Sequence, residues 1–310
     1  MENEMGVANL PEKWEEVWTD YEILRGRSLS ARTLENYRDT VVQLARFLGP
    51  VVPTMEAVTR RHVAAFLEHV AQATSGTTAA MRYRGLSAVF RVMSKPDEYG
   101  EALLARNPMT GLKPPKTSDV LVPILSLDDA KRLITTCRGS NLRDVRDEAM
   151  IRFLYDTGVR RGELVSMRID PQSLNLREGA ATVTGKTGPR IVAFGPKTGA
   201  AIFRYIRVRR RGRWRDNTAL WIGSRGPLKG NGIFQALDRR FHAARVYAPK
   251  KAHIFRRTFS HEWRAKGGQV DDLIALNGWS GPEMALRYGK SAASERARAA
   301  HARLSLGERL

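Results

Sequence analysis

A proline-rich stretch at residues 107–125, NPMTGLKPPKTSDVLVPIL, constrains the fold of this chain more than any other feature of the sequence. Proline fixes φ, lacks a backbone N–H and disfavours helix at the residue before it, so no regular helix can run through this stretch. The prolines are Pro108, Pro114, Pro115 and Pro123. We therefore expect an extended linker between two domains.

The length and composition agree with a two-domain chain. With 310 residues, 42% of them hydrophobic and 27% charged, the sequence can form two packed cores and is not typical of a disordered protein. We expect a first domain at 1–112, a linker at 113–122 and a second domain at 123–310.

The part before the linker has a helical pattern. Apolar side chains recur there at three- and four-residue spacing, as in an amphipathic helix. Ser30 and Thr59 are suitable N-caps for the second and third helices, and a fourth helix is expected from about Thr77 to Met93. The first helix contains Trp14, Val17, Trp18, Tyr21 and Leu24. Four helices in this length predict a small all-α bundle.

The part after the linker combines helices with a short hairpin. Ser126 and Asp129 form the pattern of a capping box, which opens a helix at about 127–137, and a second helix is expected at about 142–157. The segment AATVTGKTGPRIVAF at 180–194 has two β-branched runs around a turn, which predicts a β-hairpin. The predicted fold class is mainly α, with a helix-rich α+β second domain and a small sheet.

The positive charge is concentrated in the second part. The chain has 52 Lys and Arg against 32 Asp and Glu, a net charge of +20. Residues 1–120 hold 15 of each kind, whereas 121–310 hold 37 basic and 17 acidic residues. Such charge favours a polyanion as partner, most often nucleic acid. A membrane surface is the alternative, but the basic residues are spread over several predicted elements instead of one amphipathic helix.

Cysteine usage and hydropathy restrict the cellular setting. Cys137 is the single cysteine, so the chain cannot form an internal disulfide or a multi-thiolate metal site by itself. The sequence has no apolar run of 18 residues, and its N-terminus is acidic where a signal peptide would be basic. We expect a soluble protein that is not exported.

Four short motifs carry the candidate chemistry. In chain order they are TGVRRGEL around Arg160, TGKTGPR around Lys186, HIFRRTFS from His253 and LNGWSGPEMALRYGK around Tyr288. Each motif is weak alone, but together and in this order they resemble the tyrosine recombinase family, which includes phage integrases, Xer-type and Cre-like recombinases.

The resemblance assigns the site residue by residue. The arginine of the family that precedes a glutamate by three residues matches Arg160, with Glu163 as its supporting residue. The lysine of the Gly-Lys hairpin turn matches Lys186. The His-x-x-Arg motif matches His253 and Arg256, and the nucleophilic tyrosine, nine residues after a His or Trp, matches Tyr288 after Trp279.

The chemistry of these residue types agrees with that assignment. Phosphodiester transfer builds negative charge on the phosphate oxygens, and the guanidinium groups of Arg160 and Arg256 can bind those oxygens in a fixed geometry. The phenol of Tyr288 has an ordinary pKa of about 10 and needs cations or a base, for which His253 is the candidate.

The remaining two roles are less specific. Lys186 is the candidate general acid for the departing 5′-oxygen, although Lys197 and Lys229 also lie near predicted turns. Trp279 stands where the family more often has histidine. Its indole N–H can donate a hydrogen bond to a phosphate oxygen but cannot transfer a proton.

The resemblance also implies an architecture and a reaction. It implies an N-terminal SAM-like core-binding domain, a catalytic domain and a C-terminal helix that docks on a neighbouring subunit. The implied reaction uses no metal and no cofactor and resembles type IB topoisomerase chemistry, with a 3′-phosphotyrosine intermediate and a Holliday junction. The implied partners are double-stranded DNA at core attachment sites and a homotetramer assembled from monomers, with a possible directionality factor, in the bacterial cytoplasm at the nucleoid.

DNA contacts are expected from both domains. The resemblance points to helices that carry Arg32, Arg82 and Arg84, and the arginine-rich run RYIRVRRRGRWR at 204–215 points to Arg207 and Arg210. That run is alternatively a solvated helix end.

Several functions remain open from the sequence. We expect a phage or mobile-element integrase, because Trp279 replaces the commoner histidine and the helical pattern begins near residue 12, which leaves no room for an arm-binding domain. An Xer-type dimer resolvase and a catalytically silent DNA-binding regulator are the alternatives. A metal-dependent nuclease would need clustered carboxylates, and the pair Asp271 and Asp272 is better suited to a helix start.

Overall fold

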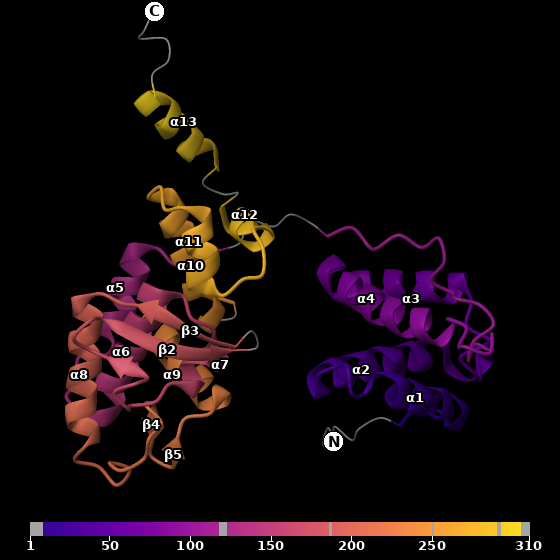
Figure 1. The fold of residues 1–310 in the computed structure, drawn as a ribbon, viewed down its shortest axis with the longest axis horizontal. Coiled ribbons are helices and arrows are strands. Elements are labelled where there is room, and N and C mark those ends of the chain that lie inside the picture. The colour runs from indigo at the N-terminus through magenta and orange to yellow at the C-terminus, as the bar shows by residue number, and fades with distance from the viewer. Residues whose placement is uncertain (1–8, 118–122, 186–187, 250, 290–292, 305–310) are drawn as a thin grey trace, which may run out of the picture. The chain divides into compact units, whose positions relative to one another are not determined.

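The structure is a computed structural model that describes residues 9–117, 123–185, 188–249, 251–289 and 293–304 (Figure 1). The chain divides into two compact units, residues 1–120 and 121–310. The point of division lies within the range expected for the linker.

The first unit is a helical bundle. Its α-helices are α1 (Glu12–Arg25), α2 (Ala31–Leu48), α3 (Arg60–Ala73) and α4 (Gly76–Met93), with a short 3-10 turn at Gly49–Val51 after α2. Ser30 caps α2 by accepting a hydrogen bond from the backbone N–H of Thr33, and Thr59 caps α3 in the same way. Its core contains the fully buried rings of Trp14, Trp18, Tyr21, Phe66 and Phe90.

The second unit contains nine described helices and two small sheets. The helices are α5 (Leu127–Thr135), α6 (Leu142–Thr157), α7 (Arg161–Ser166), α8 (Pro196–Arg209), α9 (Gly230–Ala243), α10 (Lys251–Ala265), α11 (Val270–Asn277), α12 (Glu283–Gly289) and α13 (Ala293–Leu304). The strands are β1 (Leu174–Asn175), β2 (Ala180–Gly185), β3 (Gly188–Ala193), β4 (Ile222–Gly223) and β5 (Gly226–Pro227). The expected mainly helical fold with a small sheet is confirmed.

The larger sheet is antiparallel, in the order β1-β2-β3. Ala181 and Val183 on β2, and Val192 on β3, are buried and join the core that α6 and α8 also form. Successive residues of a strand point to opposite faces, so these three side chains define the inner face of the sheet. Arg190 lies two residues before Val192 on β3, so its side chain lies on the same inner face of the sheet.

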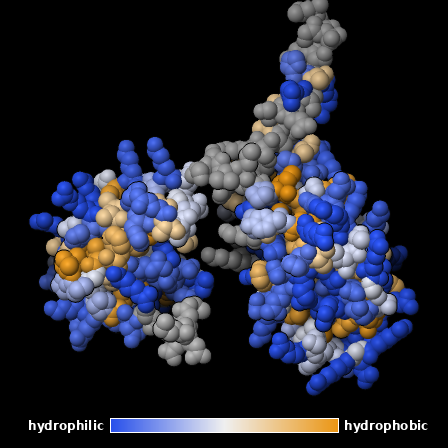
Figure 2. All heavy atoms as spheres, turned by 180° about the vertical axis from the view of Figure 1, so that it is seen from behind, coloured by the Kyte–Doolittle hydropathy of each residue, from blue (hydrophilic) through white to orange (hydrophobic). Residues whose placement is uncertain are grey.

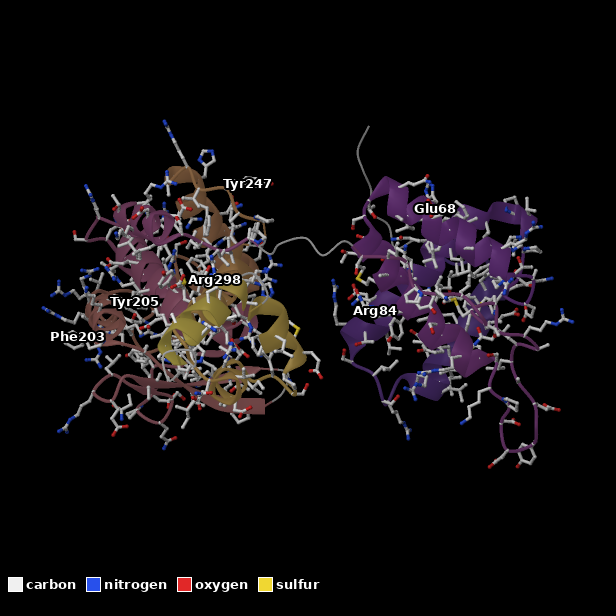
Figure 3. All side chains as sticks on the ribbon, turned by 90° about the horizontal axis from the view of Figure 1, so that it is seen from above. Glu68, Arg84, Phe203, Tyr205, Tyr247 and Arg298 are labelled. Carbon is white, nitrogen blue, oxygen red and sulfur yellow. The ribbon has the colours of Figure 1, made fainter. Side chains whose placement is uncertain are left out.

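The helices of this unit place apolar faces inward and polar faces outward. On α8, Tyr205 is fully buried while Phe203, two residues earlier, is 53% exposed (Figure 3). The space-filling view shows hydrophilic side chains over most of the visible face of the unit (Figure 2). Among the described residues, no helix is both long and apolar enough to cross a membrane.

Candidate active site

The turn between α6 and α7 positions the first arginine of the site. Gly158 ends α6 with a φ of 61°, a left-handed conformation that glycine adopts without steric penalty. A Cβ there would also lie 2.8 Å from the ring of Phe259. Arg160 directly precedes α7. The backbone N–H of Arg160 donates a hydrogen bond to the side chain of Glu163 at 2.6 Å. The carboxylate thus closes the first turn of α7.

Glu163 is a buried carboxylate between two guanidinium groups. Its side chain is 2% exposed, and it accepts from Arg160 Nη1 at 2.7 Å and from Arg190 Nη2 at 3.0 Å. Burial by itself raises the pKa of this carboxyl, but the hydrogen bonds from Arg160 and the positive charges of both arginines lower it below its ordinary value. Glu163 therefore stays ionised and holds Arg160 in one orientation.

Arg256 lies beneath the indole ring of Trp279. It comes from α10, is 1% exposed, and donates hydrogen bonds to the backbone oxygens of Gly158 at 3.1 Å and Asn277 at 2.6 Å. Its Cζ lies 5.1 Å from the centre of the Trp279 ring, a cation–π contact. The structure therefore brings together two of the predicted site residues, one from α10 and one from the turn that follows α11.

The C-terminal end of α11 collects three arginines. Arg160 donates to the backbone oxygens of Asn277 and Gly278, both at 3.3 Å, and Arg190 Nε donates to Leu276 O at 3.0 Å. Arg256 shares the oxygen of Asn277. The last carbonyls of a helix lack intrahelical partners and carry partial negative charge, so they are suitable acceptors for guanidinium groups.

Arg190 is a residue that the sequence analysis missed. It lies on β3, its side chain is 13% exposed, and it connects Glu163 to α11. One signal in the sequence points to Arg190: it lies two residues before the apolar Val192 in the predicted strand. Its charge is therefore expected on the inner face of the sheet, where a buried guanidinium needs a partner.

The other predicted site residues are placed only in part. His253 lies in the first turn of α10, half-buried and three residues before Arg256. Lys186 lies outside the described residues. The preceding Gly185 is so close to Glu163 that a Cβ would lie 2.7 Å from Oε1. Tyr288 belongs to α12, and its side chain lies outside the description.

The structure gives the three arginines predicted to contact DNA in the first unit different surroundings. Arg32 is 75% exposed and pairs with Glu35. The Nε of Arg84 donates to Ala80 O within α4 (Figure 3). Arg82 is 12% exposed and bonds Asp39 at 2.7 Å, which ties α4 to α2. DNA contact stays a prediction for all three.

The arginine-rich run at 204–215 is not a uniform cationic surface. Arg207 and Arg210 are exposed, as a DNA contact requires. Arg209 is 2% exposed and donates to backbone oxygens, including that of Ala219 at 3.0 Å, and Arg204 pairs with Glu148. Part of this charge therefore stabilises the unit.

Asp271 and Asp272 lie in the first turn of α11, where they interact favourably with the helix dipole, while Gln269 occupies the N-cap position. Among the described residues, no group of three or more His, Cys, Asp or Glu side chains could hold a metal ion.

Comparison with known proteins identifies the family. Residues 123–295 match the phage integrase family, and residues 18–93 match the N-terminal SAM-like domain of phage integrases. The chain therefore belongs to the phage integrase family, whose members include the tyrosine recombinases, as the motifs predicted.

Two curated relatives illustrate the sequence similarity. Tyrosine recombinase XerC of Alcanivorax borkumensis is 28% identical over 257 residues, which cover 81% of each chain. Tyrosine recombinase XerD of Listeria monocytogenes serotype 4b is 24% identical over 261 residues, which cover 81% of this chain and 85% of the relative.

Two solved structures show the same fold. XerH recombinase bound to a palindromic difH substrate aligns with a TM-score of 0.74 at 15% identity, covering 95% of this chain and 85% of XerH. The Tn1549 transposon integrase in complex with transposon right end DNA aligns with a TM-score of 0.72 at 17% identity, covering 94% and 98%.

Proposed function

We propose that this protein is a site-specific recombinase that cleaves and rejoins DNA strands through a 3′-phosphotyrosine at Tyr288. The observation that carries the proposal is the cluster of Arg160, Arg256 and Trp279 at the end of α11, one short turn before the helix that bears Tyr288. XerH and the transposon integrase were solved with DNA, which agrees with double-stranded DNA as the substrate.

The arginines supply positive charge at the scissile phosphate. The side chain of Arg160 is 37% exposed although Glu163 fixes it, so it can bind a phosphate oxygen without reorganising. Arg256 is covered by Trp279, so DNA binding has to move that ring before the guanidinium reaches the phosphate. These fixed cations stabilise the transition state in a reaction that we propose needs no metal.

The remaining residues move protons and close the cycle. His253 accepts the proton of Tyr288 as it attacks, and Lys186 protonates the 5′-oxygen as it leaves. The bond energy stays in the phosphotyrosine, and a 5′-hydroxyl of the partner strand reverses the step. Two such exchanges within a homotetramer form and resolve a Holliday junction, and α13 docks on the neighbouring subunit.

Covalent trapping tests the proposal. A suicide substrate, nicked near the cleavage point and built from DNA that flanks the gene, should give a protein–DNA adduct that survives denaturing electrophoresis and persists in EDTA. Tyr288→Phe should abolish the adduct, whereas Tyr247→Phe, which changes a 95% exposed phenol of the same unit, should not. DNA binding without any adduct would instead support a catalytically silent regulator.

Arginine variants test the roles in catalysis. Arg160→Ala and Arg256→Ala should reduce adduct formation by about 100-fold and keep most of the affinity for DNA, because each group acts mainly on transition-state charge. An equal loss of affinity would show that they only anchor the duplex.

We propose integration and excision of a phage or mobile element as the biological role, with Xer-type dimer resolution as the alternative. The two roles differ in outcome. An integrase joins an element to a separate target and can need a directionality factor for excision, whereas a resolvase acts on two sites within one molecule. A two-plasmid assay that scores both products distinguishes them.

A further inference from the structure

The hairpin that bears Lys186 is described up to the last pair of its strands. β2 and β3 stay in register up to Gly185 and Gly188, which pair with each other. Residues 186 and 187 join these strand ends and lie outside the described residues. A connection of two residues is short, so the strand ends limit where a side chain on it can lie. Contacts at those ends therefore bear on the candidate general acid.

The end of β2 is fastened to α7, beside which it lies (Figure 1). Ser166 is the last residue of α7, and its Oγ accepts a hydrogen bond from the backbone N–H of Thr184 at 3.3 Å. At Gly185, the next residue of β2, a Cβ would lie 2.7 Å from Oε1 of Glu163. The helix that begins after Arg160 therefore also holds one strand of the hairpin.

The other strand is fastened by a single side chain, that of Arg190. This residue follows Gly188 by two positions on β3. Its Nη2 donates to Oε2 of Glu163 at 3.0 Å, and its Nε donates to Leu276 O at 3.0 Å. The side chain is 13% exposed, so both bonds are largely shielded from water. Two bonds from different nitrogens of one planar group fix its orientation.

Glu163 is the common partner of the hairpin and of the first arginine. One of its oxygens accepts from Nη2 of Arg190 and from the backbone N–H of Arg160, and the other accepts from Nη1 of Arg160. The carboxylate also packs against Gly185. The position of the hairpin is therefore coupled to that of Arg160 through one buried carboxylate.

We propose that Arg190 is a positioning residue for the departure of the 5′-oxygen: it holds β3 so that the hairpin places Lys186 at the leaving group. The inference rests on the proposed function for the reaction. In that step the phenol oxygen of Tyr288 bonds to phosphorus, the bond from phosphorus to the 5′-oxygen breaks, and the ammonium of Lys186 gives its proton to that oxygen. An alkoxide leaves poorly without this proton, whereas Arg160 acts on the charge of the phosphate oxygens. Loss of Arg190 should therefore impair the leaving group more than the phosphate.

A sulfur leaving group separates these two effects. A suicide substrate with sulfur in place of the bridging 5′-oxygen releases a thiolate, and a thiol has a pKa of about 8.5, so this group departs without a proton. Arg190→Met removes both donors. It should slow adduct formation by at least about tenfold on the oxygen substrate and stay close to the wild-type rate on the sulfur substrate. Lys186→Ala should show the same pattern, whereas Arg160→Ala should slow both substrates.

The matched control is Arg209→Met. Arg209 is also buried, at 2% exposed, and also donates to backbone oxygens, but it lies on α8. This variant should melt below the wild type and keep the wild-type ratio of the two rates. An equal loss on both substrates in Arg190→Met, or a changed ratio in Arg209→Met, would overturn the inference and leave Arg190 with a role in the fold alone.

Amide hydrogen exchange tests the positioning without any cleavage. Because β3 loses both anchors in Arg190→Met, the amides of β2 and β3 should exchange faster than in the wild type, and those of the first unit should not. Unchanged exchange in the hairpin would contradict the inference whatever the rates show. Absence of an adduct from the wild type on both substrates would refute the proposed recombinase, and the exchange measurement would still decide whether Arg190 holds the hairpin.

Discussion

Replacement of Glu163 by glutamine tests how the candidate active site holds its first arginine. The substitution keeps the shape of the side chain and removes its charge. One carboxylate oxygen takes the backbone N–H of Arg160 and Nη2 of Arg190, and the other takes Nη1 of Arg160. An amide has only one acceptor oxygen, so in Glu163→Gln an NH₂ group must face an N–H donor of one of the two arginines.

The magnitude follows from the bonds that are lost. A hydrogen bond to a charged group contributes about 1.5–3 kcal/mol, so Glu163→Gln should lower the free energy of unfolding by about 2–3 kcal/mol. With the NH₂ group facing Nη1, the guanidinium of Arg160 would be held only by its two 3.3 Å bonds to Asn277 and Gly278. Loss of one preorganised donor costs about 100-fold in rate, and we expect that loss in adduct formation.

The assay is single-turnover trapping on a suicide substrate, combined with thermal melting. The matched control is Glu148→Gln, because Glu148 is also largely buried and also bridges two arginines, Arg152 and Arg204. This control should lose stability but keep the rate of adduct formation of the folded protein. A normal rate in Glu163→Gln, or an equal loss in Glu148→Gln, would refute the positioning role.

The pH dependence of stability provides a second readout. Because the pKa of Glu163 is lowered in the folded state, its contribution to stability is present at neutral pH and is lost as the pH falls through the folded-state pKa. Glu163→Gln lacks this contribution. The stability difference between wild type and variant should therefore shrink toward acid pH, and a difference that stays constant would contradict the mechanism.

Three further changes test neighbouring features. Gly185→Ala should slow adduct formation, measured by trapping, because its Cβ would lie 2.7 Å from Glu163 Oε1 and must displace the carboxylate or the hairpin. Arg190→Lys should slow adduct formation while anisotropy shows unchanged DNA affinity, because one ammonium cannot replace the fork that joins Glu163 to Leu276 O. Cys137 is buried and burial raises the pKa of its thiol to about 11, so a thiol reagent should label it only at the rate of unfolding in a denaturant series.

Local signals explain why the sequence predicted most elements. Ser30, Thr59 and Ser126 cap helices through bonds to residues three positions away, so the capping pattern is visible in a short window of sequence. The hairpin at 180–194 was predicted for the same reason, because its two strands adjoin one turn. The very short β1, β4 and β5 strands were not predicted, since two residues carry no periodic pattern.

The anchoring of the arginines could not be predicted, because their partners are backbone oxygens far along the chain. Arg160 and Arg190 reach the end of α11 across 117 and 86 residues, and any residue type supplies the same carbonyl. The three-residue spacing of Arg160 and Glu163 is visible in the sequence. Only the tertiary fold shows that Glu163 also pairs with Arg190.

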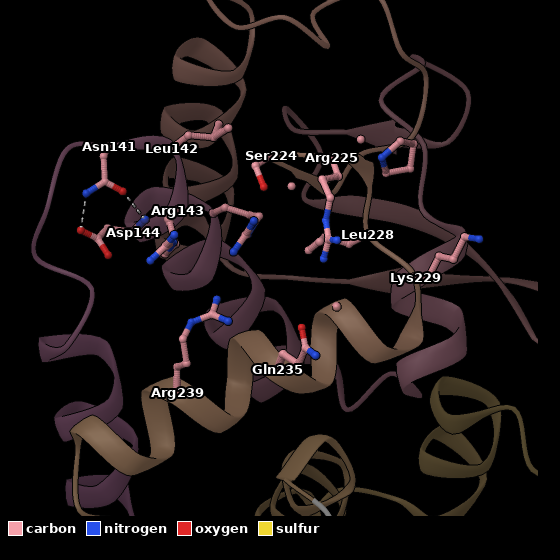
Figure 4. A pocket seen from close by; sticks show the side chains of 15 residues that line it. Asn141, Leu142, Arg143, Asp144, Ser224, Arg225, Leu228, Lys229, Gln235 and Arg239 are labelled. Carbon is pink, nitrogen blue, oxygen red and sulfur yellow. Dashed lines mark hydrogen bonds between the residues drawn. The ribbon is translucent and has the colours of Figure 1, made fainter. Parts of the chain in front are cut away.

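The same limit applies to charge as a signal for DNA binding. Arg82 and Arg209 lie in segments that predicted DNA contact, yet Arg82 joins two helices and Arg209 is enclosed by carbonyl oxygens. Arg143 and Arg225 were not singled out by any motif, yet both line a cavity and form no ion pair within the described part of the chain (Figure 4). In a chain with a net charge of +20, the number of arginines in a segment therefore does not show which of their side chains already have partners within the protein. Arg160 has a partner within the protein and is also open to solvent. Glu163 fixes one side of its guanidinium, while 37% of the side chain stays exposed. That combination is what a group acting on transition-state charge requires, since a donor that is already oriented loses little entropy when the phosphate arrives.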